Sequence, residues 1–143
     1  MPRRRVVITG IGPITPIGTG VEGLWSGLRA RRSAVRTLSR FDPEMWRSRC
    51  AGEVEGFDAT EHLDAKRARR LDRFGQFSVV ATKLALADAE LDLAREDRER
   101  VGAMMGTALG GIGFAEGELT KFVQHGIRAV DPLLALAVFG GAS

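Results

Sequence analysis

The sequence predicts an α/β fold in which helices and strands form layers around one core. Two apolar runs bounded by glycine, 6–9 and 101–105, are typical of short buried strands. Between them, residues 66–93 contain a helix that is apolar around most of its circumference, as expected of a helix that lies between layers. A length of 143 residues, with 44% hydrophobic and 27% charged residues, suits one folded domain.

The first helix is expected to begin at Thr19, after a turn region rich in glycine and proline. Thr19 and Glu22 have the spacing of a capping box, in which two side chains satisfy backbone amides at the start of a helix. Four apolar positions form its core-facing stripe: Val21, Leu24, Trp25 and Leu28. Three arginines follow at its end, where cations complement the helix dipole: Arg29, Arg31 and Arg32.

The middle of the chain is expected to be irregular from 33 to 46, with a short edge strand at 51–54 and one helical turn at 58–63. A cationic head precedes the apolar part of the long helix: Lys66, Arg67, Arg69, Arg70 and Arg73. If a helix starts near Asp64, the first of these cations occupy its first turns. Cations at the start of a helix oppose its dipole. The run therefore indicates either a solvated face or a surface for an anionic partner.

The last part of the chain begins with a solvated connector at 95–100 and the second predicted strand at 101–105. A helix is expected at 114–124, and an apolar run follows at 133–139. The sequence stops on glycines, alanine and serine without a polar tail, which is typical of a chain cut inside a domain.

Two glycine-rich segments invite comparison with nucleotide-binding loops. The first glycine segment, residues 10–20, has Thr15 where a dinucleotide fingerprint needs its third glycine. The second glycine segment, residues 106–113, is followed by Phe114 and Ala115 where a P-loop needs Lys and Ser or Thr. Neither segment predicts a nucleotide site. The second is either a tight turn or a close approach of the backbone to a ligand or another subunit.

Other reactive residue types are sparse. His62 and His125 are far apart and Cys50 is the only cysteine, so we predict no metal site, no cofactor and no cysteine nucleophile, and interpret Cys50 as a structural thiol. A net charge of +3 permits an acidic partner, but no aromatic residues interleave with the cations as nucleic-acid binding would require. The absence of a targeting segment and of an apolar run near the roughly 20 residues of a membrane span favours the cytoplasm.

An ordered series of short motifs resembles the β-ketoacyl-acyl carrier protein synthases of the elongating, synthase II-like type. These are condensing enzymes of fatty-acid and polyketide synthesis. The matching stretches are residues 4–12, 15–18, 40–42, 51–54, 69–74 with 76–77, 101–102, and the glycines at 106, 110 and 111. Single motifs are weak, but their order and spacing are specific and cover essentially the whole chain.

The resemblance implies a thiolase-like αβαβα sandwich of two similar halves that dimerises, with itself or with a related ketosynthase. Residues 1–143 would be a partial amino-terminal domain. In the family, an acyl group moves from carrier protein to a cysteine, and decarboxylated malonyl-carrier protein then attacks it. The family's cysteine, histidines and lysine lie beyond this sequence, so no catalytic residue is expected here and the isolated chain should be inactive. A non-catalytic subunit resembling a chain length factor, or an anion-recognising interaction module, stays an alternative.

The resemblance also assigns recognition residues. Four cations match positions that meet the acidic acyl carrier protein: Lys66, Arg69, Arg70 and Arg128. Leu109 matches a bulky residue that gates the acyl pocket, and Leu133 and Leu134 match an often aromatic pair at the pocket's border. Two leucines there depart from the family pattern and leave the preferred acyl length open.

Overall fold

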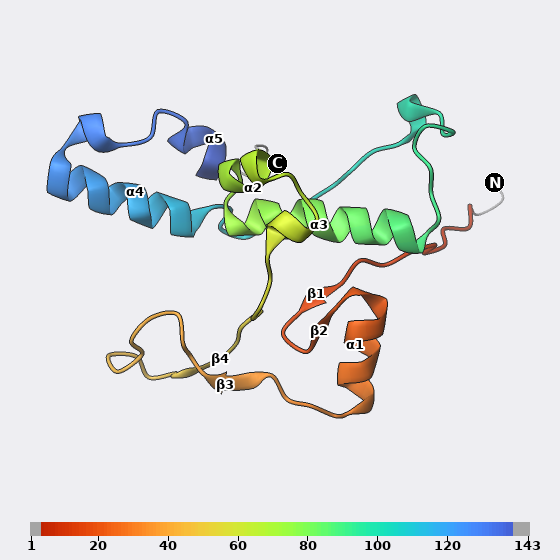
Figure 1. The fold of residues 1–143 in the computed structure, drawn as a ribbon, viewed down its shortest axis with the longest axis horizontal. Coiled ribbons are helices and arrows are strands. Elements are labelled where there is room, and N and C mark those ends of the chain that lie inside the picture. Colours follow the sequence, from red (N-terminus) through yellow and green to blue (C-terminus); the bar gives the residue numbers. More distant parts are fainter. Residues whose placement is uncertain (1–3, 139–143) are drawn as a thin grey trace. The chain divides into compact units, whose positions relative to one another are not determined.

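A computed structural model describes residues 4–138, which divide into two compact units (Figure 1). Of these residues, the first unit comprises 4–57 and 81–92, and the second comprises 58–80 and 93–138. One helix, α3 (Arg73–Asp88), contributes its first half to the second unit and its second half to the first.

The first unit is built from two antiparallel strand pairs and a helix. β1 (Ile14–Thr15) pairs with β2 (Gly18–Thr19), and α1 (Gly20–Arg29) follows at once and packs against this hairpin. β3 (Val35–Thr37) pairs with β4 (Cys50–Gly52). The predicted strand at 51–54 is thus confirmed as β4, which begins and ends slightly earlier, and its partner lies in the stretch expected to be irregular.

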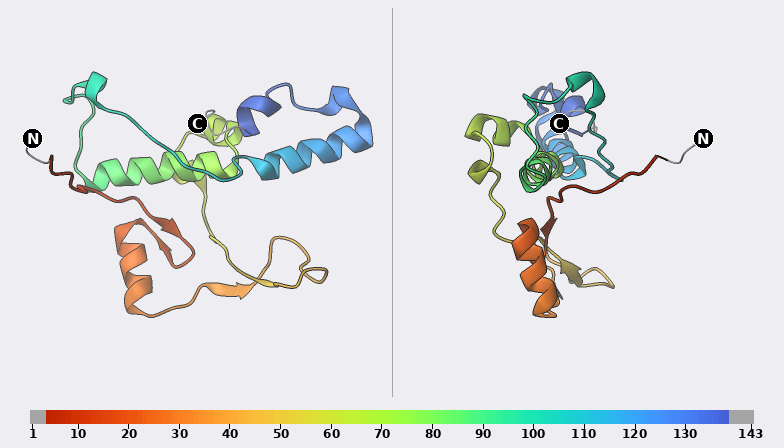
Figure 2. Two further views of the ribbon diagram at one scale, coloured as in Figure 1. Left: turned by 180° about the vertical axis from the view of Figure 1, so that it is seen from behind. Right: turned by 90° about the vertical axis from the view of Figure 1, so that its right-hand side faces the viewer.

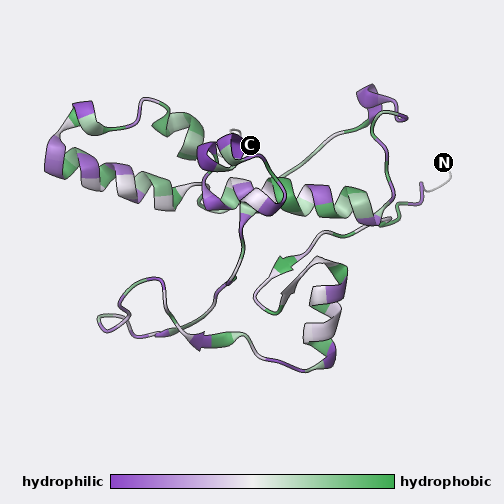
Figure 3. Ribbon diagram, in the orientation of Figure 1, coloured by the Kyte–Doolittle hydropathy of each residue, from purple (hydrophilic) through white to green (hydrophobic). Residues whose placement is uncertain are grey.

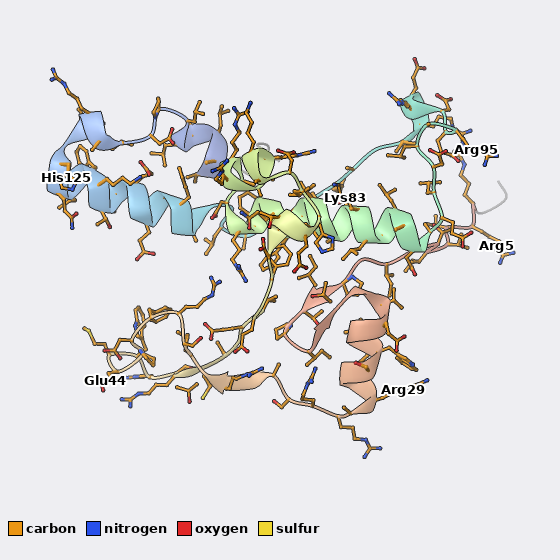
Figure 4. All side chains as sticks on the ribbon, viewed as in Figure 1. Arg5, Arg29, Glu44, Lys83, Arg95 and His125 are labelled. Carbon is orange, nitrogen blue, oxygen red and sulfur yellow. The ribbon has the colours of Figure 1, made fainter. Side chains whose placement is uncertain are left out.

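Helix α1 begins where the sequence predicts. Thr19 is its N-cap with an extended backbone, but its side chain makes no capping hydrogen bond. The end of α1 is fixed instead, because Arg32 Nη2 donates to the Ile17 carbonyl at 2.6 Å and the Arg29 guanidinium lies 5.0 Å from the Trp25 ring centre. Figure 4 labels Arg29 at this end of the helix. Within residues 4–138, the predicted stripe is half covered, with Trp25 still 50% exposed.

The loop between β3 and β4 is closed by a carboxylate. Glu53 Oε2 accepts hydrogen bonds from the Ser39 amide at 2.9 Å and the Ser39 hydroxyl at 2.8 Å. These bonds hold the pKa of the Glu53 carboxyl below its ordinary value of 4.5, and the bond from the Ser39 hydroxyl has the larger effect. Glu53 belongs to one of the matching motifs, and the structure gives that residue a local role in closing the loop.

The second unit is helical in its described residues. It contains η1 (Ala59–Glu61), α2 (Ala65–Arg70), the start of α3, η2 (Arg98–Arg100), α4 (Ile112–His125), η3 (Ile127–Ala129) and α5 (Leu134–Val138). α4 contacts both η3 and α5, and Figure 2 shows this group from behind and from the side. In Figure 3, α2 is coloured mostly hydrophilic and α5 hydrophobic. The predicted helical turn at 58–63 and the helix at 114–124 are confirmed, with α4 beginning two residues earlier.

The helix predicted after the cationic head is confirmed as α3, and the head itself forms the separate short helix α2. α2 ends at Arg70, the backbone of Leu71 is extended, and α3 begins at Arg73. The break is stabilised by Gln76, whose Nε2 donates to the carbonyls of Ala68 at 2.8 Å and Leu71 at 3.2 Å at the end of α2. Val80 of α3 is fully buried, which agrees with the expected position of this helix inside the fold.

The two predicted strands at 6–9 and 101–105 are not formed in the described structure. A strand exists only through hydrogen bonds to a neighbour, and no segment of residues 4–138 pairs with either run. Their apolar side chains are therefore exposed: Val6 by 93%, Ile8 by 85% and Met104 by 97%.

Candidate functional site

The exposed cations of α2 form a compact cationic face, which we define as Lys66, Arg67, Arg69 and Arg70. Asp64 caps this short helix, since its Oδ1 accepts from the Arg67 amide at 2.9 Å. The Arg69 Nε donates back to the Ala65 carbonyl at 3.1 Å. Within residues 4–138, the side chains of Lys66 and Arg70 make no hydrogen bond or ion pair. Their charges are therefore available to a partner.

A hollow of about 430 Å³ lies beside the cationic face, entirely within the second unit. Arg69 and Arg70 line it together with the apolar side chains of Phe74, Phe114 and Leu133. Two acids, Asp72 and Asp131, complete its polar lining. The hollow thus combines guanidinium groups with aromatic and aliphatic walls, a combination suited to an acidic group that carries an apolar part.

Only one of the three leucines expected to border an acyl pocket lines this hollow. Leu133 lines the hollow, whereas Leu109 and Leu134 do not. Leu109 lies in the second glycine segment and is 68% exposed, and Leu134 is half-buried at the start of α5. Arg128 lies on η3, exposed and outside the lining of the hollow.

The second glycine segment packs against the end of α5. The Gly111 amide donates to the Val138 carbonyl at 2.9 Å, and the Gly110 amide to Thr107 Oγ1 at 3.0 Å. A Cβ on Gly111 would collide with the Ala137 carbonyl oxygen. Of the two interpretations left open, the structure shows a tight turn whose close approach is to the chain itself.

The first glycine segment approaches α3 in the first unit. A Cβ on Gly10 or Gly12 would collide with the α3 backbone around Ala85. The Ile11 amide, which a phosphate would need, donates to Asp88 Oδ2 at 2.9 Å. The Asp88 carboxylate would repel a phosphate, and the α3 backbone fills the space that a phosphate would need beside Gly10 and Gly12.

A buried carboxylate, Glu118 of α4, was not singled out by the sequence analysis. Its side chain is almost completely buried, with a relative exposure of 2% for the residue. Oε1 accepts from Lys121 Nζ at 2.5 Å, and Oε2 accepts from the Asp131 amide at 2.6 Å. Both bonds hold the pKa of this carboxyl below its ordinary value of 4.5, with the larger effect from Lys121 and the smaller from the Asp131 amide. Burial acts in the opposite direction.

The remaining reactive residue types lie on or beside different elements. Cys50 is an exposed free thiol in β4, and its structural role stays a prediction. His125 ends α4, as Figure 4 shows, and His62 follows η1. Among residues 4–138, no three acidic, histidine or cysteine side chains are grouped so that they could hold a metal ion. No helix in the same range has the length and apolar character needed to cross a membrane.

Comparison with known proteins gives one consistent result. Residues 3–136 match the family model described as "Beta-ketoacyl synthase, N-terminal domain". The chain is 37% identical over 134 residues to a 3-oxoacyl-[acyl-carrier-protein] synthase 2 of Synechocystis sp., covering 94% of this chain and 32% of that protein. The chain therefore spans about a third of the length of the curated relatives it matches.

Solved structures agree with the sequence comparison. The ishigamide ketosynthase/chain length factor aligns with a TM-score of 0.77 at 35% identity, covering 99% of this chain and 35% of its own. One chain of a structure described as a type II PKS acyl-carrier protein in complex with its ketosynthase aligns with a TM-score of 0.78 at 27% identity, covering 99% of this chain and 38% of that chain. The predicted α/β fold class is thereby confirmed.

Proposed function

Because the chain belongs to the β-ketoacyl synthase family through its N-terminal domain, we propose that it recognises the carrier protein for a condensing enzyme. That enzyme would join an acyl thioester to malonyl-acyl carrier protein with loss of carbon dioxide, as an acyltransferase of fatty-acid or polyketide elongation. The fold is the thiolase-like α/β fold of its solved relatives. The reacting cysteine and histidines would lie outside residues 1–143, and the isolated chain would be inactive.

The observation that carries this proposal is the cationic face beside the hollow. The acyl carrier protein is acidic in this family, and complementary charge speeds and orients such an encounter more than it tightens the complex. Lys66, Arg69 and Arg70 on α2, with Arg128 on η3, would bind its acidic side chains. Arginine suits this task because its planar fork binds carboxylates through two parallel hydrogen bonds.

The acyl group would then meet apolar side chains of the same unit. Leu133 supplies one wall of the hollow, and we propose that Leu109 and Leu134 border the path of the chain in the complete protein. A second ketosynthase chain, identical or related, is the proposed dimer partner. A solved relative described as a ketosynthase/chain length factor supports a ketosynthase-related partner, and it does not favour a non-catalytic role for this chain over a catalytic one.

The test is charge reversal in the complete protein. Arg69→Glu/Arg70→Glu should raise KM for the carrier-borne substrate about 10- to 100-fold, since close charge pairs at interfaces couple strongly. Turnover of an N-acetylcysteamine thioester, which lacks a carrier, should stay unchanged. Arg98→Glu/Arg100→Glu, on η2, is the matched control because it reverses two exposed arginines outside the cationic face. Equal KM values for the two double variants would refute the proposed docking role.

A further inference from the structure

We propose that Glu118 is a positioning residue that sets the geometry of carrier-protein docking, by fixing the loop that carries Arg128 and one wall of the hollow. This inference rests on the proposed function and adds to it a residue that the family motifs do not assign. Three observations support it: the burial of the carboxylate, the division of its partners, and the place of its longer-range partner in the chain.

Burial makes the carboxylate dependent on its partners. Removing a charged group from water is costly unless hydrogen bonds replace those of the solvent, and both Glu118 oxygens have such bonds. Within residues 4–138, no buried side-chain nitrogen or oxygen lacks a partner. Loss of the Glu118 side chain would therefore leave the Asp131 amide without its acceptor.

The two partners serve different purposes. Lys121 lies three residues away on the same helix, so its bond neutralises the charge without joining separate parts of the chain. Asp131 lies 13 residues away, beyond the end of α4 and beyond η3. The bond from its amide is the one that holds the loop.

The loop between these points carries Arg128. At its start, Gly126 ends α4 with φ of +78° and donates its amide to the Phe122 carbonyl at 2.8 Å. At its end, the Asp131 amide is held by Glu118 at 2.6 Å. Arg128 stands between two fixed points, so the direction of its charge depends on both of them.

The same bond reaches the hollow through Asp131. Asp131 Oδ1 accepts from the Leu133 amide at 2.8 Å, and the Asp131 carbonyl accepts from the Leu134 amide at 3.0 Å, which starts α5. Asp131 and Leu133 both line the hollow. Glu118 thus fixes a cation and an apolar wall that would contact different parts of one carrier-borne substrate.

The experiment compares three variants of the complete protein. Glu118→Leu should raise KM for the carrier-borne substrate about tenfold, because loss of a hydrogen bond to a charged group costs about that factor. Glu118→Gln should restore KM to within about twofold, since the amide oxygen still accepts from Asp131. Lys121→Met, the control, keeps the Asp131 bond and should leave KM unchanged. The N-acetylcysteamine thioester would contact the apolar wall but not Arg128, so Glu118→Leu should raise its KM less than that of the carrier-borne substrate, and the other two variants should leave it unchanged.

The outcomes separate this inference from the proposed function. An unchanged KM in Glu118→Leu, or an equal loss with both substrates, would overturn the positioning role. If Arg69→Glu/Arg70→Glu also leaves KM unchanged, the docking proposal itself fails. Should Glu118→Leu not fold, amide exchange in the unaltered protein decides: the Asp131 amide should exchange slowly, and rapid exchange would refute the bond.

Discussion

The glycines at positions 10 and 12 lie against the backbone of α3, whereas those at 106 and 113 have open space, within the described structure, where a side chain would begin. In the sequence, the first and second glycine segments look alike, since each follows an apolar run and leads toward a helix. In the structure, the first is a packing element. The second is a turn in which Gly111 packs, while Gly110 has a φ of +57° that glycine adopts readily.

The difference shows what a glycine motif needs before it indicates a ligand. A phosphate loop requires free amides, but the Ile11 amide is bound to Asp88 and the Gly111 amide to the Val138 carbonyl. Glycine in both segments lets the chain approach itself. The function proposed for the second unit depends instead on the charged and apolar side chains that line the hollow.

The largest effect is expected from Gly12→Val. Its Cβ would overlap the Ala81 carbonyl oxygen of α3, and helix backbone cannot move aside as a flexible side chain can. We expect the free energy of unfolding to fall by about 3 kcal/mol or more, at the upper end of overpacking effects. Denaturant unfolding of the complete protein measures this.

The matched control is Gly117→Ala on α4, where nothing lies within 4 Å of the new Cβ. Alanine there should raise stability by about 0.5–1 kcal/mol, because it favours the helix more than glycine does. Equal unfolding midpoints for Gly12→Val and Gly117→Ala would contradict the close approach of the first glycine segment to α3.

A smaller loss is expected from Gly111→Ala, which would sharpen the comparison within the second segment. The new methyl group would meet the Ala137 carbonyl and lie 3.1 Å from Asp72 Oδ2, and the latter can move. We expect a loss of about 1–3 kcal/mol. Gly106→Ala, in the same segment with open space around it, should change stability by less than about 0.5 kcal/mol. A larger loss for Gly106→Ala than for Gly111→Ala would contradict this assignment.

Local signals in the sequence predict the helices well. The start of α1 at Thr19 and the spacing of apolar residues along α4 are signals between residues a few positions apart. Both helices form near the expected bounds. The break at Leu71 was missed because it depends on Gln76 bonding back to two carbonyls, which no hydrophobic period records. The runs at 6–9 and 101–105 have strand-like composition, but pairing requires a neighbour that residues 4–138 do not supply.

In the candidate site, too, the features that depend on neighbouring residues could be predicted, and those that depend on folding could not. The cations of α2 lie within residues 66–70, and the sequence predicts either a solvated face or a surface for an anionic partner there. That Arg69 shares a hollow with Phe114 and Leu133 follows only from the folding of the second unit. Glu118 was missed because its partner amide lies 13 residues away, and a single acid on a helix is ordinarily solvated.

The smallest expected effect is a loss of stability at acid pH. It extends the comparison to one carboxylate in each unit. Asp88 accepts from the first segment at an exposed position, whereas Glu118 is buried between Lys121 and the Asp131 amide. Because folding lowers the pKa of Glu118 from 4.5, its ionised form contributes stability above about that pH, and the contribution is lost as pH falls through the lower folded pKa. The stability difference between the unaltered protein and Glu118→Gln should therefore shrink below pH 4.5.

Lys121→Met removes the main cause of the lowered pKa of Glu118, so the loss of stability in acid should begin at a higher pH. A stability difference that stays constant from pH 7 to pH 3 would show that Glu118 is not held in its ionised form by these partners.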